Sequence, residues 1–278
     1  MNLVKVSDGV YAYLGENDPH DGTNAGFIVT GEGVVVIDSH FTWARDLVRE
    51  IRNITREPIR FLVNTHMHVD HTTGNQVWAQ EGATIVASEV TRLNLEDWGT
   101  QHAINWMREL DAAKAKGVVP VLPHMGFSGE LVLNLGNKHM RLVHAGTGHT
   151  SGDVYILMPR ERIIFTGDLL FSHNHCVFKP YSHTNPGNWI RVIDRLLELA
   201  VDTIVPGHGP LSTKTDLRAF RDYLVDFTTQ VKTMIAQGKT LEEVRRGIDL
   251  SKYSHWHHQE FIPENIEMCY RIYRHMKE

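Results

Sequence analysis

Short apolar runs, separated by glycine turns, alternate with amphipathic stretches in the first third of the chain. The stretch 42–55 carries Leu47, Val48 and Ile51 at helical spacing and predicts a helix, and 73–80 predicts a shorter one. The apolar runs have strand length and predict strands at 10–14, 25–30, 34–38, 59–63 and 83–87.

The pattern changes towards the end of the chain, where strands give way to helices. The mixed stretch 91–116 ends at Gly117 and predicts one long helix. Further strands are predicted at 131–135, 140–143, 154–158, 163–166 and 203–205. Further helices are predicted at 188–199, 217–237, 241–248 and 263–275. Two sheets covered by helices satisfy this order, so we expect an α/β (α+β) fold.

Length and composition fit an ordinary globular protein. The 278 residues, of which 42% are hydrophobic, suit one domain over 1–278 with a helical C-terminal extension at about 212–278. The net charge is −5, and no basic stripe predicts a nucleic-acid partner. No apolar run has the length of a membrane span. We therefore expect a small-molecule partner, and a homo-oligomer is compatible with the sequence.

Two features bear on the compartment. Cys176 and Cys269 are the only cysteines, so a disulfide framework is not expected. The segment 1–6 enters a strand-like pattern without the profile of a signal peptide. The expectation is a cytoplasmic protein, although a secreted chain trimmed of its signal would have the same sequence.

Histidines and aspartates gather where four apolar runs end. Sites in sheet proteins form at strand ends, where loops expose side chains on a rigid frame. The four corners read T-H-M-H-V-D-H at 65–71, G-T-G-H at 146–149, T-G-D at 166–168 and P-G-H-G at 206–209.

These residue types are metal ligands. Neutral imidazole and carboxylate bind zinc, and iron or manganese are alternatives because the ligands alone do not select the metal. Asp168 alone could be a turn residue and His208 alone a capping residue, but their joint placement favours ligands. Seven candidates exceed one tetrahedral site and suit two metals about 3.5 Å apart.

The four corners resemble the motifs of the metallo-β-lactamase superfamily of hydrolases. The resemblance covers about residues 8–225 and includes His-x-His-x-Asp-His at 66–71, Gly-His-Thr-x-Gly-Asp at 148–153, Asp168 and Pro-Gly-His-Gly at 206–209, in the same order. It implies an αββα sandwich, the metallo-β-lactamase fold, with two zinc ions at one edge between the sheets.

The resemblance also implies the role of each residue. It assigns His66, His68 and His149 to the first metal, Asp70, His71 and His208 to the second, and Asp168 to both. Asp38 is expected to orient the histidine loop through hydrogen bonds, unless it is only a turn residue. The implied mechanism is attack by a metal-bridging hydroxide, with Asp70 and Asp168 as the catalytic carboxylates.

The branch of the superfamily is narrowed by Asp168. The β-lactamases proper usually carry Cys or Ser near this position, whereas the thioesterase and lactonase branches resemble this chain. The expected substrate is a small-molecule ester, thioester, lactone or amide. Three alternatives remain: β-lactamase activity as the main or a side reaction, a mononuclear iron enzyme like the persulfide dioxygenases, and a binding protein with a structural metal.

Substrate contacts are expected from loops near the metals. His173, His175, Lys179 and Tyr181 follow Asp168 closely, and one of them can donate a hydrogen bond to a developing oxyanion. The polar turn 17–24 is expected at the rim. Two further groups have no assigned role. The first is expected in the core or in a pocket wall and consists of Trp98, Trp106 and Met107. The second is expected at the surface or in an oligomer contact and consists of His255, Trp256, His257 and His258.

Overall fold

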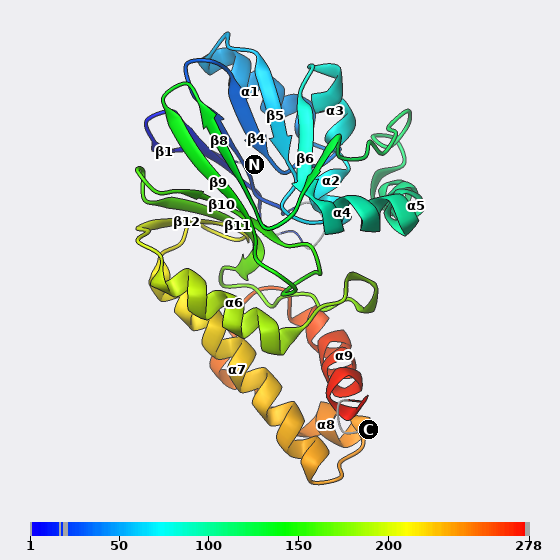
Figure 1. Ribbon diagram of the computed structural model, residues 1–278. Helices are drawn as coiled ribbons and strands as arrows, with labels where there is room; N and C mark the ends of the chain where they lie inside the picture. Colours follow the sequence, from blue (N-terminus) through cyan, green and yellow to red (C-terminus); the bar gives the residue numbers. More distant parts are fainter. Residues whose placement is uncertain (1, 17, 19–21, 276–278) are drawn as a thin grey trace.

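Two β-sheets pack face to face in the computed structural model, which describes residues 2–16, 18 and 22–275 (Figure 1). In these residues the first sheet has seven strands in chain order, antiparallel from β1 to β4 and parallel from β4 to β7. Its strands are β1 (Asn2–Ser7), β2 (Val10–Leu14), β3 (Ala25–Val29), β4 (Val34–Ile37), β5 (Ile59–Val63), β6 (Thr84–Ser88) and β7 (Met125–Phe127).

The second sheet has five strands in the described residues, in the order β12-β11-β10-β9-β8. Neighbours are antiparallel except β11 and β12, which are parallel. The strands are β8 (Glu130–Leu135), β9 (Lys138–His144), β10 (Val154–Met158), β11 (Ile163–Phe171) and β12 (Thr203–His208).

The main core lies between the two sheets. Val35 and Ile37 of β4 pack in one buried cluster with Ile156 of β10 and Phe165 of β11. The sheets approach closely at Gly26, where a Cβ atom would lie 2.3 Å from a ring carbon of Phe165. Apolar side chains of both sheets therefore meet in one layer, as sheet packing requires.

Helices cover both outer faces (Figure 1). On the first sheet, α1 (Ala44–Ile54) buries Leu47 and Ile51, and α3 (Asn75–Gln80) buries Trp78. On the second sheet, α6 (Pro186–Glu198) and α7 (Lys214–Ala236) bury a cluster around Trp189 and Phe220. This helix–sheet–sheet–helix order confirms the predicted fold class.

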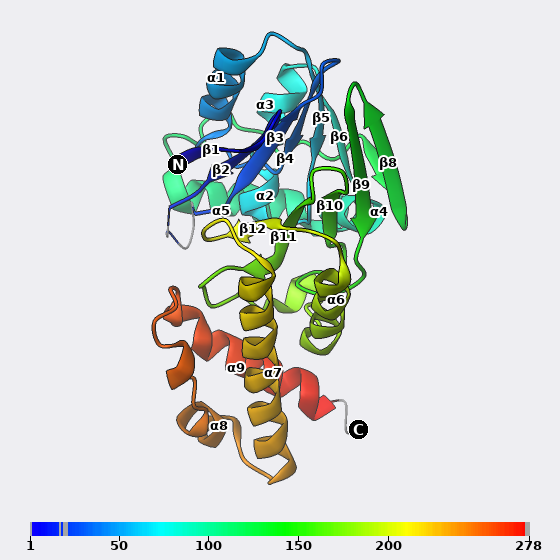
Figure 2. The ribbon, with the colours of Figure 1, turned by 90° about the vertical axis from the view of Figure 1, so that its left-hand side faces the viewer.

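The C-terminal helices extend away from the sandwich (Figure 2). Helix α7 begins with a capping box at Thr213 and runs outward, and α8 (Leu241–Gly247) and α9 (Ile262–His275) fold back against it. Among the helices of the described residues, none combines the length and the apolarity that a membrane span requires.

The prediction of one helix over 91–116 is wrong. The structure forms α4 (Glu89–Asn94), a π-helical turn at Leu95–Gly99 and α5 (Thr100–Asp111). The side chain of Ser88 caps α4, and that of Thr100 bonds the carbonyl of Leu95 across the wider turn. Besides the short 3₁₀ turns at Pro180–Ser182, Ser251–Tyr253 and Gln259–Phe261, two short elements of the described residues had no prediction: α2 (Val69–Thr72) and strand β7.

Candidate metal centre

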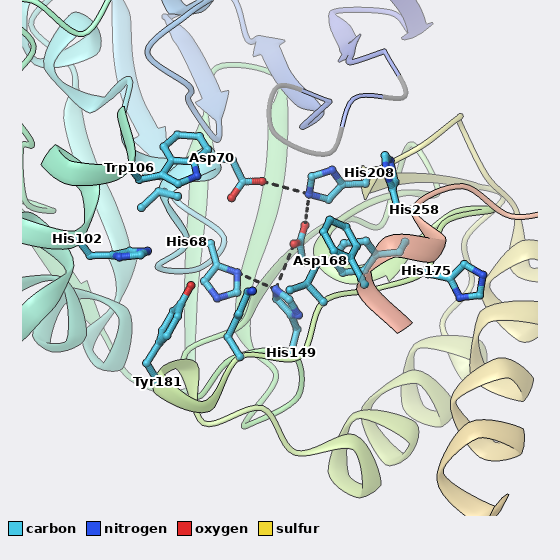
Figure 3. A pocket seen from close by; sticks show the side chains of 15 residues that line it. His68, Asp70, His102, Trp106, His149, Asp168, His175, Tyr181, His208 and His258 are labelled. Carbon is cyan, nitrogen blue, oxygen red and sulfur yellow. Dashed lines mark hydrogen bonds and ion pairs between the residues drawn. The ribbon is translucent and has the colours of Figure 1, made fainter. Parts of the chain in front are cut away.

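Four strand ends and loops bring the predicted ligands to one edge of the sandwich. His66, His68 and the helix α2 follow β5, and His149 lies in the loop after β9. Asp168 lies within β11, and His208 ends β12, which pairs with β11 in parallel. The ligands from the second sheet therefore face those of the first, as Figure 3 shows.

The first group consists of His66, His68, His149 and Asp168, whose ligand atoms all lie within 4.8 Å of one another. His149 Nε2 lies 2.8 Å from His68 Nδ1 and 3.2 Å from Asp168 Oδ2. His66 Nε2 lies 3.6 Å from the same Oδ2. Two imidazole nitrogens therefore lie beside one oxygen of Asp168, and the nitrogen of His68 lies beside that of His149.

The second group consists of Asp70, His71 and His208. Asp70 Oδ2 lies 3.2 Å from His208 Nε2 and 3.4 Å from His71 Nε2. The other oxygen of Asp168, Oδ1, lies 3.1 Å from His71 Nε2 and 3.5 Å from His208 Nε2. Asp168 thus presents one oxygen to each group.

The donor atoms fit metal cations. His66 Nε2, His71 Nε2 and Asp168 Oδ1 are buried and make no hydrogen bond within the described residues. An unsatisfied buried polar atom costs about 1–3 kcal/mol, so such a concentration points to a bound ligand. Imidazole nitrogens and carboxylate oxygens converging on one point are the donors of zinc, iron and manganese sites.

The electrostatics agree with this fit. Burial lowers the pKa of His66 and of His68 well below the ordinary value, which keeps both rings neutral, as metal ligands must be. Burial alone would raise the pKa of Asp168, but His71 and His208 hold it well below its usual range. The carboxylate of Asp168 is therefore ionised and favours positive charge beside it.

Asp38 holds the histidine loop. Its backbone is left-handed, with φ 60°, and its carboxylate accepts hydrogen bonds from Thr65 N and Thr65 Oγ1, both at 2.7 Å. The same carboxylate lies 2.8 Å from His71 Nδ1. Because Nδ1 is held in this way, Nε2 of His71 is directed towards the centre.

Asp153 holds the loop of His149. Its Oδ1 and Oδ2 accept hydrogen bonds from Thr150 N at 2.9 and 3.0 Å, and Gly148 N bonds the carbonyl of Thr150. Burial raises the pKa of Asp153 to about 6. The Gly-His-Thr-x-Gly-Asp segment is therefore a closed turn that places one ligand.

Thr23 lies in the turn 17–24 that was expected at the rim, but its contact with the centre was not singled out from the sequence. Its hydroxyl donates a 2.6 Å hydrogen bond to Asp70 Oδ2, and its backbone bridges to His208. The next residue, Asn24, donates to the carbonyls of Pro206 and Gly209. Of the predicted rim 17–24, positions 17 and 19–21 lie outside the described residues. A threonine in a loop carries no sequence signal for such a role.

The rings of the ligands pack against aromatic residues. The ring of Trp189 lies 5.1 Å from that of His149, and Phe171 stacks on His208 at 4.9 Å with an interplanar angle of 7°. Position 207 also requires glycine, because a Cβ atom there would lie 1.9 Å from Asp168 Oδ1. Packing therefore fixes ligand positions as firmly as hydrogen bonds do.

A cavity of about 350 Å³ opens onto the ligands. Five of the predicted ligands (His68, Asp70, His149, Asp168 and His208) line one side of it. Its other lining residues are the apolar Val69, Trp106, Phe171, Val177 and Phe261 and the polar His102, His175, Lys179, Tyr181 and His258. Such an apolar cavity with a few converging polar groups is typical of a small-molecule site.

Three of the four predicted substrate contacts line this cavity. The ring of Tyr181 lies 6.0 Å from that of His68, and burial raises its pKa, so the hydroxyl keeps its proton. Lys179 pairs with Glu264 at 2.8 Å. His173 does not line the cavity: its side chain is 47% exposed and pairs with Asp216 at 3.3 Å.

The structure also places the two groups that had no assigned role from the sequence. Trp106 lines the cavity, whereas Met107 is buried in the core. The interpretation of 255–258 as a surface cluster is wrong for Trp256, which is buried against Tyr223, and for His258. The reason is a tertiary contact, in which the backbone around 257 pairs with the loop at 173–175.

Comparisons with known proteins agree with this architecture. A family model, the metallo-beta-lactamase superfamily, matches residues 18–208. The chain is 24% identical to the alpha subunit of 2,4-dinitroanisole O-demethylase from Nocardioides sp. (strain JS1661), over 84% of its own length and 64% of that relative. It is 22% identical to metallo-beta-lactamase type 2 of Bacteroides fragilis, over 75% of its own length and 79% of that relative.

A third relative is acyl-coenzyme A thioesterase of Gallus gallus, 28% identical over 52% of the chain and 55% of that protein. The chain thus spans less than two thirds of the demethylase subunit and of this thioesterase.

Two solved structures share the fold. A metallo-beta-lactamase from Pontibacter korlensis has a TM-score of 0.65 and 21% identity, and the match covers 80% of this chain and 98% of the other. A stereoselective inverting sec-alkylsulfatase from Pseudomonas sp. has a TM-score of 0.77 and 17% identity, with 98% of this chain and 50% of the other covered. The second match extends over the C-terminal helices.

Proposed function

The chain belongs to the metallo-beta-lactamase superfamily, and we propose that it is a metal-dependent hydrolase of small-molecule esters, lactones, thioesters or amides. The observation that carries the proposal is Asp168, which presents one oxygen to each of two groups of ligands. Two donor groups that share a carboxylate are the arrangement of a dinuclear hydrolytic site.

The residues divide between two metal ions, with zinc as the expected metal. His66, His68 and His149 would hold one ion, Asp70, His71 and His208 the other, and Asp168 would contact both. When bound, such ions act as Lewis acids and lower the pKa of water, so that a nucleophile forms near neutral pH.

The chain's own residues supply orientation and proton handling. Asp70 is fixed by Thr23 beside His208, where its carboxylate can accept a proton from the attacking water. The Tyr181 hydroxyl lies at the His68 side of the cavity and can donate a hydrogen bond to the carbonyl oxygen that gains charge. Trp106, Phe171 and Phe261 exclude water around the substrate.

The names of the relatives support hydrolysis but do not identify the substrate. Their names include a thioesterase and a β-lactamase, both of which cleave an acyl bond. The apolar lining of the cavity favours an uncharged acyl group. The test is a panel of chromogenic esters, lactones, thioesters, phosphodiesters and cephalosporins, assayed with zinc-loaded protein and with its Asp168→Ala variant.

We expect turnover of a carboxylic acid derivative by the wild type and loss of turnover in Asp168→Ala with the fold retained. An unchanged rate of turnover in the variant would contradict the proposal. β-Lactamase activity is the second candidate because the Bacteroides fragilis relative aligns over most of both chains. Faster turnover of cephalosporins than of any ester would favour it, and oxygen uptake with persulfides would instead favour an iron oxygenase.

A further inference from the structure

The segment between α8 and α9, residues 251–261, contributes His258 and Phe261 to the cavity that opens onto the ligands, although it lies far from most of them in sequence. Two backbone hydrogen bonds fix it to the loop after β11: His257 N to His173 O at 3.0 Å and His175 N to His257 O at 2.9 Å. Trp256 is buried against Tyr253 and Tyr223 on the inner side. The segment is therefore a rigid part of the cavity wall.

His258 is the polar group that this segment contributes to the cavity. Its backbone is left-handed, with φ 63°, a conformation uncommon outside glycine and often found at functional sites. Its side chain is 10% exposed and lines the cavity together with the metal ligands. Figure 3 shows His258 on the His208 side of the cavity and Tyr181 on the opposite side.

One nitrogen of His258 is held and the other is available. Nδ1 lies 3.1 Å from Oε1 of Glu260, so the carboxylate sets the orientation of the ring. Nε2 has no partner within the described residues. A histidine that lines a substrate cavity and has Nδ1 held by a carboxylate is the arrangement of a general acid–base group.

We propose that His258 protonates the leaving group of the substrate, with Glu260 as its positioning residue; this rests on the proposed hydrolase function. Water attacks the acyl carbon, the bond from that carbon to the leaving oxygen breaks, and its electron pair goes to the oxygen. The Nε2 proton of His258 moves to this oxygen, and the proton lost by the water restores the imidazolium. Ester and water thus give acid and alcohol.

The proposal narrows the substrate class. A thiolate leaves readily without a proton, whereas an alkoxide is a strong base and departs slowly unless it is protonated. A general acid at this position therefore serves oxygen esters and lactones of aliphatic alcohols, rather than thioesters.

The test compares two esters that share one acyl group. This acyl group is the one that the protein turns over in the panel of substrates. One is the 4-nitrophenyl ester, whose leaving group is a weak base, and the other is the benzyl ester, whose leaving group is a strong base. The variant is His258→Asn, because asparagine tolerates the left-handed backbone. His255→Asn, on the exposed side of the same segment, is the matched control.

We expect His258→Asn to lower kcat/KM for the benzyl ester by about 100-fold or more and to leave the 4-nitrophenyl ester within about threefold of wild type. Glu260→Gln should give a smaller loss with the same selectivity, and His255→Asn should change neither rate. Metal content and the melting temperature of His258→Asn should match those of the wild type.

Equal losses for both esters would show that His258 only shapes the wall and would overturn the proposal, as would no loss for either. Wild-type protein that cleaves neither ester but turns over another carboxylic acid derivative of the panel would overturn this inference and leave the proposed function standing. Wild-type protein that turns over no member of the panel would overturn both.

Discussion

At the scale of single residues, His66, Asp70 and His71 are each held by a side chain that is not itself a ligand. Asp38 bonds Nδ1 of His71, and the hydroxyl of Thr23 bonds Asp70. Such partners set the orientation and basicity of a ligand, and their loss typically costs about 10–100-fold in metal affinity or activity. The geometry of the centre therefore depends on residues that the ligand motifs do not contain.

Thr23→Val tests this dependence. Valine keeps the shape of threonine but removes the hydroxyl that donates to Asp70 Oδ2. Because the bond is made to a charged group, we expect kcat/KM to fall by about 10–100-fold. Steady-state kinetics with Thr23→Ser, which keeps a hydroxyl, provide the control. Equal rates in the valine variant and the wild type would show that Asp70 needs no such support.

Gly207→Ala tests the close packing behind Asp168. The added methyl group would lie 1.9 Å from Asp168 Oδ1, so either the strand or the carboxylate must move. We expect binding of at least one metal to weaken by about tenfold or more, because a displaced carboxylate no longer reaches both ligand groups. Gly238→Ala is a control for the substitution itself, since its Cβ would meet no atom within 4 Å, although φ is +77°. Unaltered metal affinity in Gly207→Ala would contradict the packing argument.

The seven ligand candidates could be predicted at this scale because each follows an apolar run at a turn-rich corner. Asp38 was also recognisable at the end of a strand. Thr23 and Asn24 lie in the turn that was expected at the rim, but their individual roles were not recognisable, because hydroxyls and amides are common in loops and their partners lie far away in sequence. Hydrogen bonds between segments far apart in the chain produce no periodic pattern in the sequence.

At the scale of elements, the strands were predictable and the helical insert was not. Alternating and continuous apolar runs placed most strands to within a few residues, but the short β7 had no prediction and β11 continues five residues beyond the predicted end at 166. The stretch 91–116 has no clear apolar stripe, and its π-helical turn at Leu95–Gly99 and its end at Asp111 depend on local side-chain bonds. Trp106 lies in α5, after this break, and lines the cavity.

Helix α7 is the element that supports the C-terminal part of the cavity wall. Phe227 is fully buried, and its ring lies 5.7 Å from that of Phe178 and 6.0 Å from that of Tyr223. Tyr223 in turn packs against Trp256 of the segment that carries His258. The helix therefore connects the core of the second sheet with the cavity.

Phe227→Ala should test this connection. We expect the free energy of unfolding to fall by about 3–5 kcal/mol, because a buried aromatic ring is replaced by a cavity. Denaturant unfolding followed by circular dichroism measures the change. Val119→Ala, at a side chain that is 59% exposed, should change stability by less than about 0.5 kcal/mol. A loss for Phe227→Ala no larger than this control would refute the role of α7.

At the scale of the whole molecule, the candidate metal centre joins the two sheets. His66, His68, Asp70 and His71 follow a strand of the first sheet, and His149, Asp168 and His208 belong to the second. The overall arrangement could be predicted from the order of strands and helices and from the resemblance. The return of residues 251–261 to the cavity could not, because it depends on packing between elements far apart in sequence.

This placement predicts that metals stabilise the fold as a whole. A metal that binds the native state and not the unfolded chain adds about 2.7 kcal/mol at a free concentration of 100 times Kd. We therefore expect the melting temperature to fall when the protein is treated with a chelator and to recover when zinc is added. Asp168→Ala should show a smaller difference between the two conditions. A melting temperature that does not respond to the chelator would show that the sheets are held together without metal.

The central claim is that one carboxylate, Asp168, serves two metal ions in each chain. Its most direct test is the number of metal ions bound, measured by inductively coupled plasma mass spectrometry on protein purified without added metal and then equilibrated with zinc. The account predicts two ions per chain in the wild type and fewer in Asp168→Ala. One ion or less per wild-type chain, with no gain in hydrolysis on addition of zinc, would contradict it.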